Sequence, residues 1–210
     1  MSFKNFFYGF FKSYFDKKIY MQGLSHILNI REKYEHISNL QDVDYKIFSQ
    51  NGEDGIIDYL LNKIKIEKPK FVEVGVGDYL ESNTRFIFER TSASGLIIDC
   101  MNGFEKEVKN NLKVWKGELF IHEEMIESKS LNNILTKYNF SENTDLFSLD
   151  IDGLDYWVIK NLPKNFSKIV VLEYNSVFGD KLEVTVPEIK MFDRKKYHHS
   201  HLCYGSSLKA

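Results

Sequence analysis

The stretch Phe71–Leu80, which reads FVEVGVGDYL, constrains the fold more than any other part of the chain. An apolar run contains one acid, Glu73, and then leads into two glycines, Gly75 and Gly77, separated by a single residue. Glycine allows a sharp backbone turn and leaves room for a ligand to approach the amide groups. The pattern therefore predicts a buried strand that ends in a ligand-binding turn, as at the start of an open α/β sheet.

Length, charge and cysteine content indicate the class of protein. The 210 residues are enough for one α/β domain, and the net charge of -2 gives no reason to expect nucleic-acid binding. The two cysteines, Cys100 and Cys203, form no CxxC pair, which argues against a disulfide framework or a structural zinc site. The sequence has neither an apolar run of ~20 residues nor the pattern of a signal peptide, so we expect a cytoplasmic protein.

The first 40 residues have a composition of their own. Residues 3–20 carry aromatic side chains at helical steps of threes and fours, with lysines in much of the remainder, and residues 24–37 form a second amphipathic segment. We expect two helices that form an N-terminal appendage, 1–40, before a main domain, 41–210. The favoured role of the aromatic stripe is packing against this domain or a second subunit, as in a homo-oligomer. Contact with an anionic membrane surface is the less favoured alternative.

The segment Phe48–Leu61, FSQNGEDGIIDYLL, predicts a capped helix. Ser49 or Asn51 can cap its start, and Glu53 and Asp54 suit the positive end of the helix dipole.

From Lys70 onward, apolar runs alternate with helical segments. The predicted strands cover 71–75, 95–99, 117–121, 145–150 and 168–173. The predicted helices cover about 82–89, 103–112, 131–138 and 156–162. This alternation predicts a parallel sheet wound on both faces, with all strand C-termini along one edge, where the ligand crevice lies.

Acidic residues stand at all five predicted strand ends: Glu73; Asp99; Glu123 and Glu124; Asp150 and Asp152; and Glu173, which is followed by Tyr174 and Asn175. Asp99 follows Gly75 by 24 residues (99 − 75), close to the spacing of about 20 at which an acid reaches ribose hydroxyls. The strand ends therefore predict a nucleoside site.

The glycine loop indicates which nucleoside. A dinucleotide fingerprint needs a third glycine where this chain has Leu80, and the acids Glu73, Asp78 and Glu81 would repel a pyrophosphate. These features disfavour a nicotinamide oxidoreductase. A nucleoside with a positive group, such as S-adenosylmethionine, fits better.

Six segments together resemble the FkbM-type S-adenosylmethionine-dependent methyltransferases of bacterial capsular polysaccharide clusters, in particular those linked to O-methyl phosphoramidate. The segments are SQNGEDGII, FVEVGVGDYLESNTRF, GLIID, LFSLDIDGLDYWVIKNL, VVLEYNSVFG and YGSSLKA, so the resemblance runs from about Phe48 to the end. It implies a class I methyltransferase (Rossmann-like) fold. Sheets of that class have seven strands, and because this chain ends at Ala210 we expect the domain to lack its last two strands and to be cut short at its C-terminus.

The resemblance also implies which residues bind the cofactor. The methionine part would be held by the loop after the first strand, the start of the next helix and a neighbouring segment: Glu73, Gly75, Gly77, Asn83, Thr84 and Gln50. Asp99 would bind the ribose hydroxyls, and Asp150 would lie beneath the methionine ammonium. Glu124 would accept the adenine amine while Met125 packs on the ring. Ordinary core packing is an equal alternative for Met125.

The acceptor side is less determined. Methyl transfer requires mainly alignment and desolvation, but a sugar hydroxyl acceptor also needs a base, for which Asp152, Glu173 and the histidines at 198, 199 and 201 are candidates. A phosphate-type oxygen needs none, and the basic segment 194–207, with Tyr204, would then surround it. We assign the catalytic positions to Asp152, Glu173, Asn175 and Tyr204. The expected acceptor is a small-molecule or nucleotide-linked saccharide of capsule biosynthesis, and a non-catalytic scaffold is the alternative function.

We assign no metal from the sequence. Asp150, Asp152, Glu173 and Asn175 nevertheless converge from adjacent strand ends, and some related methyltransferases hold a divalent cation there. A cation at this position is an alternative.

Overall fold

The computed structural model describes residues 3–112 and 117–210, except for the side chains of residues 3–10, 12 and 13. The predicted stripe positions Phe3, Phe6, Phe7 and Phe10 therefore lie outside the described side chains. The chain divides into two compact units. The first contains Met1–Glu67 and Glu81–Ile87, and the second contains Lys68–Leu80 and Phe88–Ala210.

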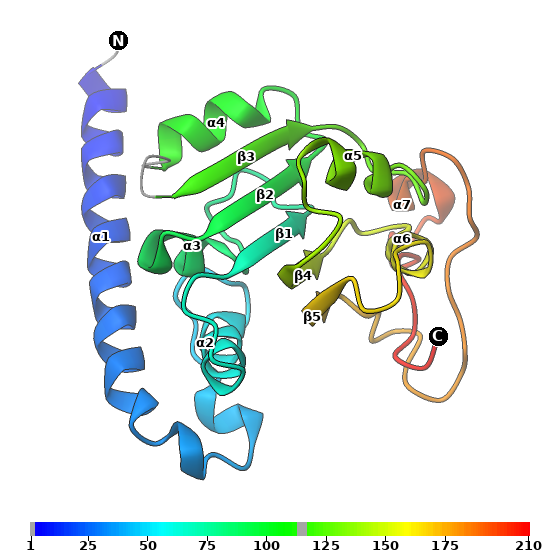
Figure 1. Ribbon diagram of the computed structural model, residues 1–210. Helices are drawn as coiled ribbons and strands as arrows, with labels where there is room; N and C mark the ends of the chain where they lie inside the picture. Colours follow the sequence, from blue (N-terminus) through cyan, green and yellow to red (C-terminus); the bar gives the residue numbers. More distant parts are fainter. Residues whose placement is uncertain (1–2, 113–116) are drawn as a thin grey trace. The chain divides into compact units, whose positions relative to one another are not determined.

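A single long helix, α1 (Phe3–Arg31), begins the first unit, where the sequence predicted two helices (Figure 1). Gly23 does not interrupt it, because the glycine is used for close packing: a Cβ there would lie 2.5 Å from Cγ1 of Ile47. Two short 3-10 turns follow, η1 (Tyr34–His36) and η2 (Leu40–Val43). The prediction of a second helix over 24–37 was therefore wrong.

The next helix, α2 (Glu53–Lys63), lies in the segment predicted to be helical, but neither Ser49 nor Asn51 is its N-cap residue. Gly52 stands at the N-cap. Oδ2 of Asp54 accepts the backbone N–H groups of Ile47, Phe48 and Ser49, each at 2.7 Å, and Oγ of Ser49 accepts the N–H of Asp54 at 3.1 Å. This reciprocal arrangement fixes the loop before the helix.

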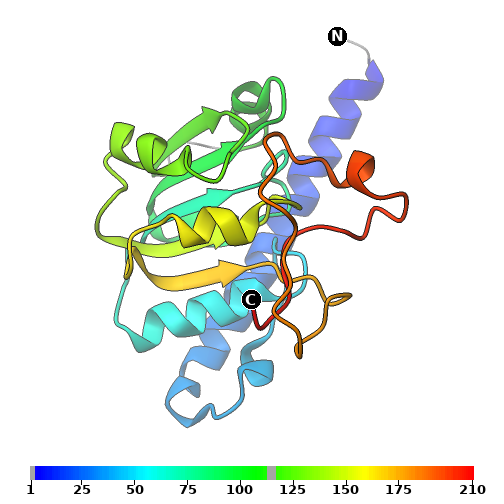
Figure 2. The same ribbon diagram turned by 90° about the vertical axis from the view of Figure 1, so that its right-hand side faces the viewer.

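The second unit contains a five-stranded, all-parallel sheet in the order β3-β2-β1-β4-β5 (Figure 2). The strands are β1 (Lys70–Val74), β2 (Ser94–Asp99), β3 (Glu118–Glu123), β4 (Thr144–Leu149) and β5 (Ser167–Leu172). The intervening helices are α3 (Arg85–Thr91), α4 (Phe104–Asn111), α5 (Leu131–Lys137) and α6 (Asp155–Lys160), and α7 (Arg194–Tyr197) follows the last strand. This is an α/β fold of the Rossmann-like kind, as predicted.

The main core lies between the sheet and two helices. Alternate residues of β1, β2 and β4 face α5 and α6, and the buried cluster comprises Val72, Val74, Leu96, Ile98, Phe147 and Leu149 of the strands with Leu131, Ile134, Leu135 and Val158 of the helices. The strand order reverses between β1 and β4, so the crevice of this fold opens at their carboxyl ends.

The helix after β1 begins later than predicted. The sequence predicted a helix from Ser82, with Asn83 and Thr84 at its start, whereas α3 begins at Arg85. Oγ of Ser82 accepts the backbone N–H groups of Thr84 and Arg85 at 3.2 and 3.3 Å. Ser82 therefore caps the helix from outside it, and residues 82–84 form the turn before the helix.

The strand β5 forms one edge of the sheet, and its exposed face carries Val170 and Leu172 beside Lys168. Val170 and Leu172 are exposed, as are Tyr174 and Val177 just beyond the strand. Among the described residues, no helix combines the length and the apolar character that crossing a membrane requires.

Candidate functional site

A cavity of about 250 Å³ lies at the carboxyl ends of four strands in the second unit. Each of β1, β2, β3 and β4 contributes the residues at or just after its end, and the C-terminal segment contributes Met191 and Phe192. The lining brings together six of the predicted site residues: Gly75, Asp99, Glu124, Met125, Asp150 and Asp152. The cavity thus lies at the edge of the sheet where the sequence predicted the ligand crevice.

The glycine turn after β1 is fixed by its neighbours. Gly75 has a φ of +84° and lies so close to the end of β4 that a Cβ would be 1.6 Å from the carbonyl oxygen of Asp150. Only glycine fits there. Gly77, with a φ of +55°, donates its N–H to Oδ2 of Asp99 at 2.7 Å.

Asp99 joins two turns at the cavity. While Oδ2 binds Gly77, its Oδ1 accepts the N–H of Met101 at 2.8 Å. A carboxylate can accept about four hydrogen bonds, so two further donors, such as a pair of ribose hydroxyls, can be accommodated. Cys100, the next residue, also lines the cavity, and burial and the charge of Asp99 raise the pKa of its thiol.

The residues after β3 form another wall. Glu124 and Met125 line the cavity as predicted, and Ile126 and Glu127 extend this wall. Nε2 of His122 lies 3.0 Å from Oε2 of Glu124, which orients the carboxylate. Glu123 is used differently, because its Oε2 accepts the N–H of Gly103 at the start of α4.

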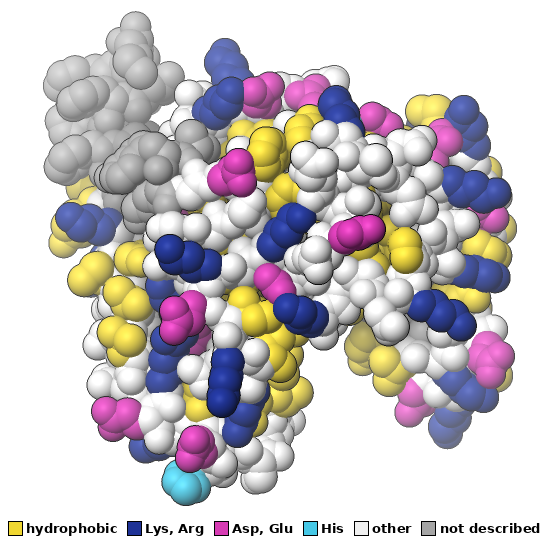
Figure 3. Space-filling view, viewed as in Figure 1, with side chains coloured by type: hydrophobic (Ala, Val, Ile, Leu, Met, Phe, Trp, Pro, Cys, Tyr) yellow, Lys and Arg dark blue, Asp and Glu magenta, His cyan; other side chains and the backbone are white. Residues whose placement is uncertain are grey.

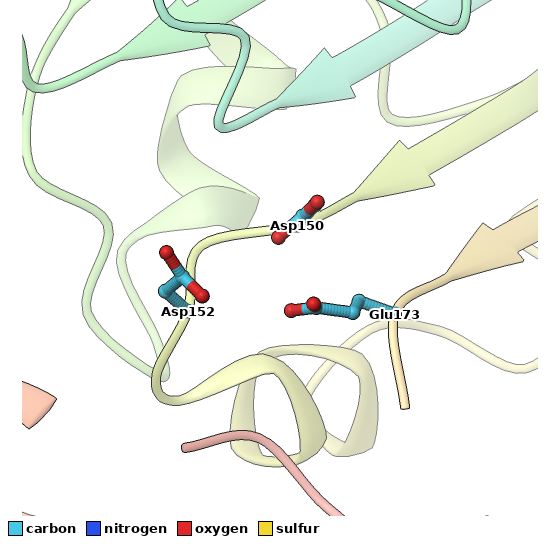
Figure 4. Close-up of side chains that lie close together, drawn as sticks. All are labelled: Asp150, Asp152 and Glu173. Atoms are coloured by element: carbon cyan, nitrogen blue, oxygen red, sulfur yellow. The ribbon is translucent and has the colours of Figure 1, made fainter. Parts of the chain in front are cut away.

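Three carboxyl groups meet beside the cavity. Asp150 and Asp152 follow β4 and Glu173 follows β5, and each offers an oxygen within 4.8 Å of the others (Figure 4). Figure 4 shows the carboxyl groups of Asp152 and Glu173 pointing toward the same space. Oε2 of Glu173 is buried and has no hydrogen-bond partner among the described residues.

The crowding of acids changes their protonation. The pKa of Glu173 is raised to about 8, mainly by burial. The charge and hydrogen bond of Asp150 and the charges of Asp152 and Asp155 add to this shift. Burial also raises the pKa of Asp150, whose side chain nevertheless retains exposed surface. We infer that Glu173 and Asp150 share one proton near neutral pH, because two adjacent carboxylates disfavour double ionisation.

The loop between β4 and α6 is held by a buried acid. Asp155 accepts the backbone N–H groups of Ile151 and Gly153, each at 2.9 Å. Burial raises the pKa of Asp155 as well. These bonds fix the turn that carries Asp152.

The C-terminal segment supplies a positive partner. Nη1 of Arg194 lies 2.5 Å from Oδ1 of Asp152, and its guanidinium lies over the ring of Tyr204, 4.9 Å from the ring centre. Burial and the charges of Glu173 and Asp152 raise the pKa of Tyr204. Tyr204 therefore lies within the electrostatic environment of the acid group.

Asn175 organises this segment instead of lining the cavity. It is fully buried, and Nδ2 donates to the carbonyls of Leu202 and Tyr204 at 2.8 and 2.9 Å. Its Oδ1 accepts the N–H of Val177 at 3.0 Å. Both amide hydrogens and the oxygen are engaged, so we interpret Asn175 as a residue that positions Tyr204.

Sequence reasoning missed the wall formed by Met191 and Phe192. Phe192 packs so closely on the β4–α6 loop that a Cβ on Gly153 would lie 3.2 Å from Cδ1 of its ring. No local pattern marks these residues, because the contact spans about 40 positions in the sequence. Glu127 was also missed, although the acidic run from Glu123 could have indicated it.

Five predicted cofactor residues are not in the cavity lining: Gln50, Glu73, Gly77, Asn83 and Thr84. Gly77 instead donates its N–H to Asp99 beside the cavity. Glu73 is buried within β1. Gln50, Asn83 and Thr84 belong to the first compact unit, so their approach to the cofactor stays a prediction.

The acid group also has the chemistry of a cation site. Carboxylate oxygens are the ligands that hard divalent cations prefer, and Asp150, Asp152 and Glu173 are close enough to share one ion. Asn175, the fourth residue of the predicted alternative, is already used by backbone partners. The geometry therefore offers three ligands at most from this set.

Neither the scan against protein-family models nor the search of curated proteins finds a match for this chain.

Proposed function

We propose that this protein is an S-adenosylmethionine-dependent O-methyltransferase that acts in the cytoplasm on a precursor of capsular polysaccharide. The acceptor would be a small-molecule or nucleotide-linked saccharide with a sugar hydroxyl or a phosphoramidate oxygen. The observation that carries the proposal is the charge of the cavity. Its described lining includes five acids and neither lysine nor arginine: Asp99, Glu124, Glu127, Asp150 and Asp152.

The charge favours a cationic nucleoside over a phosphorylated one. A pyrophosphate in such a cavity would be repelled by every charged side chain of the lining, whereas sulfonium and ammonium groups would be attracted. This reasoning extends the sequence prediction, which rested on the missing third glycine, the acids of the glycine loop and the acids at the strand ends.

The size of the cavity points the same way. About 250 Å³ is slightly below the ~300–1,000 Å³ of typical small-molecule sites. A single nucleoside with a short side chain suits this space better than a dinucleotide does.

We propose which residues at the strand ends would contact each part of the ligand. Asp99 would accept the ribose hydroxyls with the lone pairs that Gly77 and Met101 leave unused. Met125 and Glu124 would contact adenine, and Gly75 would leave space for the methionine part beside Asp150.

The bound cofactor would supply an activated methyl group whose leaving group is a neutral thioether. The protein's residues would align the acceptor oxygen, exclude water and, for a hydroxyl acceptor, remove its proton. Asp152 and Glu173 lie close to Asp150, Arg194 pairs with Asp152 and lies over the ring of Tyr204, and these groups would face the acceptor. Because its pKa is raised to about 8, Glu173 holds a proton near neutral pH and would serve as a base only after losing it at more alkaline pH.

The test is calorimetric titration with S-adenosylhomocysteine, first with the intact chain and then with Asp99→Ala. Loss of a charge-assisted hydrogen-bond acceptor should weaken binding by about 10- to 100-fold. The matched control is Asp180→Ala, an exposed acid outside the cavity, which should bind normally. Absence of binding by the intact chain would overturn the proposal, whereas binding without turnover on any acceptor would favour the non-catalytic scaffold.

A further inference from the structure

The helix α1 has two opposite apolar faces, and only one of them is used within the first unit. Asp16, Tyr20, Gly23 and Ile27 follow at steps of four, three and four, so they lie along one side of the helix. Ile27 is 1% exposed, and the ring of Tyr20 lies 5.9 Å from that of Phe86. This face packs against the rest of the unit.

The other face is aromatic and exposed. Phe11, Tyr14, Phe15 and Lys18 also follow at steps of three and four, on the side opposite Tyr20. The three aromatic side chains are between 53% and 58% exposed. Within the first unit this face therefore keeps more than half of the surface of Tyr14 and Phe15 exposed, which leaves it available to a further surface.

The charges of α1 are sorted between these faces. Asp16 is the single acid among the first 31 residues, and it faces inward, where Oδ2 pairs with Nη2 of Arg85 at 3.0 Å. Arg31, at the other end of the helix, also turns inward and pairs with Asp58. Lys17 and Lys18 are exposed and have no ion pair among the described residues.

The outward surface of α1 therefore combines exposed aromatic rings with positive charge alone. Figure 3 shows hydrophobic side chains and dark-blue basic side chains next to one another along the left edge, where Figure 1 draws α1. Aromatic rings settle at the level of lipid headgroups, and lysines are attracted to anionic headgroups. A second copy would instead bring an equally basic face against this one, and like charges would oppose each other.

We propose that the face of α1 formed by Phe11, Tyr14, Phe15, Lys17, Lys18 and Ile19 binds the surface of an anionic phospholipid membrane. The helix lies along the interface with its aromatic rings among the headgroups. Its inward face keeps its contacts with the first unit. This inference is independent of the proposed methyltransferase activity, and it reverses the preference drawn from the sequence.

The test is co-sedimentation of the full chain with vesicles of phosphatidylcholine, with and without phosphatidylglycerol. Binding is expected only with the anionic lipid and should weaken as salt is raised. Lys17→Gln with Lys18→Gln should lower the partition coefficient about 25-fold, because each lysine near the surface contributes about fivefold. Tyr14→Ser with Phe15→Ser should also abolish most of the binding.

Matched controls distinguish vesicle binding by this face of α1 from nonspecific binding by other exposed lysines and apolar side chains. Lys195→Gln with Lys196→Gln removes the same charge from an exposed part of the second unit, and Val177→Ser with Leu182→Ser removes exposed apolar side chains. Both control variants should bind vesicles as the unmodified chain does. The unfolding temperature of every variant should be unchanged, since all these side chains are exposed.

Three results would overturn the proposal. One is the absence of co-sedimentation with anionic vesicles. Another is an equal loss of binding in the control variants. The third is a dimer, seen by sedimentation velocity, that Tyr14→Ser with Phe15→Ser dissociates in the absence of vesicle binding, because a second copy would then be the partner of this face.

Discussion

The protonation of Glu173 predicts a loss of stability at alkaline pH that one substitution removes. In the folded protein Glu173 keeps its proton up to a pKa of about 8, whereas the unfolded chain loses it near the usual 4.5. Between these values the folded state binds more protons, so its free energy of unfolding falls as the pH rises. The destabilisation is absent below pH 4.5 and complete above pH 8.

The size of the effect follows from the shift. One pKa unit corresponds to about 1.4 kcal/mol, so the fully expressed shift would cost about 5 kcal/mol, of which about 2.7 kcal/mol lies above pH 6. Glu173 is only partly buried and shares its proton with Asp150, so solvent screening reduces this figure. We expect about 1–2 kcal/mol between pH 6 and pH 9.

The assay is urea unfolding of the unmodified chain and of Glu173→Gln at pH 6 and pH 9. Glutamine keeps the shape of the protonated side chain and can still donate to Asp150, so the variant should lose less stability over this range and be the more stable protein at pH 9. Glu183→Gln, which changes an exposed carboxylate, should follow the unmodified chain. An identical pH dependence in the unmodified chain and Glu173→Gln would refute the inferred proton sharing.

Two further predictions concern the folding of each unit. Gly75→Ala places a methyl group against the carbonyl of Asp150 at a positive φ and should cost about 3 kcal/mol or more, whereas Gly179→Ala, at a φ of +72° with nothing within 4 Å, should cost about 1 kcal/mol. Equal losses in thermal unfolding would show that the close approach is relaxed in solution. Arg31→Met leaves the fully buried carboxylate of Asp58 without its two guanidinium donors and should cost about 3–5 kcal/mol in urea unfolding. A loss below about 1 kcal/mol would indicate that water replaces the arginine.

The strands were predictable because each one carries its own signal. Buried parallel strands are short apolar runs, and the predicted runs at 71–75 and 145–150 lie within one residue of β1 and β4. The prediction of two N-terminal helices was wrong because the extent of this helix is not marked by a local signal. The sequence showed two amphipathic segments, 3–20 and 24–37, whereas the structure has one helix to Arg31, in which Gly23 packs against the distant residue Ile47.

Some residues of the candidate site could likewise be predicted from the sequence, and others could not. Parallel strands bring their ends to one edge, so Asp99, Asp150 and Glu124 could be placed together from the order of strands alone. Phe192 could not, because its place in the cavity wall depends on the path of a long irregular segment. The side chain of Asn175 was misjudged because its position after a strand end suits a ligand as well as it suits the backbone of the C-terminal segment.

The central claim is that the cavity at the strand ends binds a cationic nucleoside. The most direct measurement is a crystal structure of the full chain grown with S-adenosylhomocysteine. The account predicts electron density with the ribose at Asp99, the adenine beside Met125 and the amino group next to Asp150. Density for the ligand outside this cavity, or an unchanged cavity at a ligand concentration that saturates binding in solution, would contradict it.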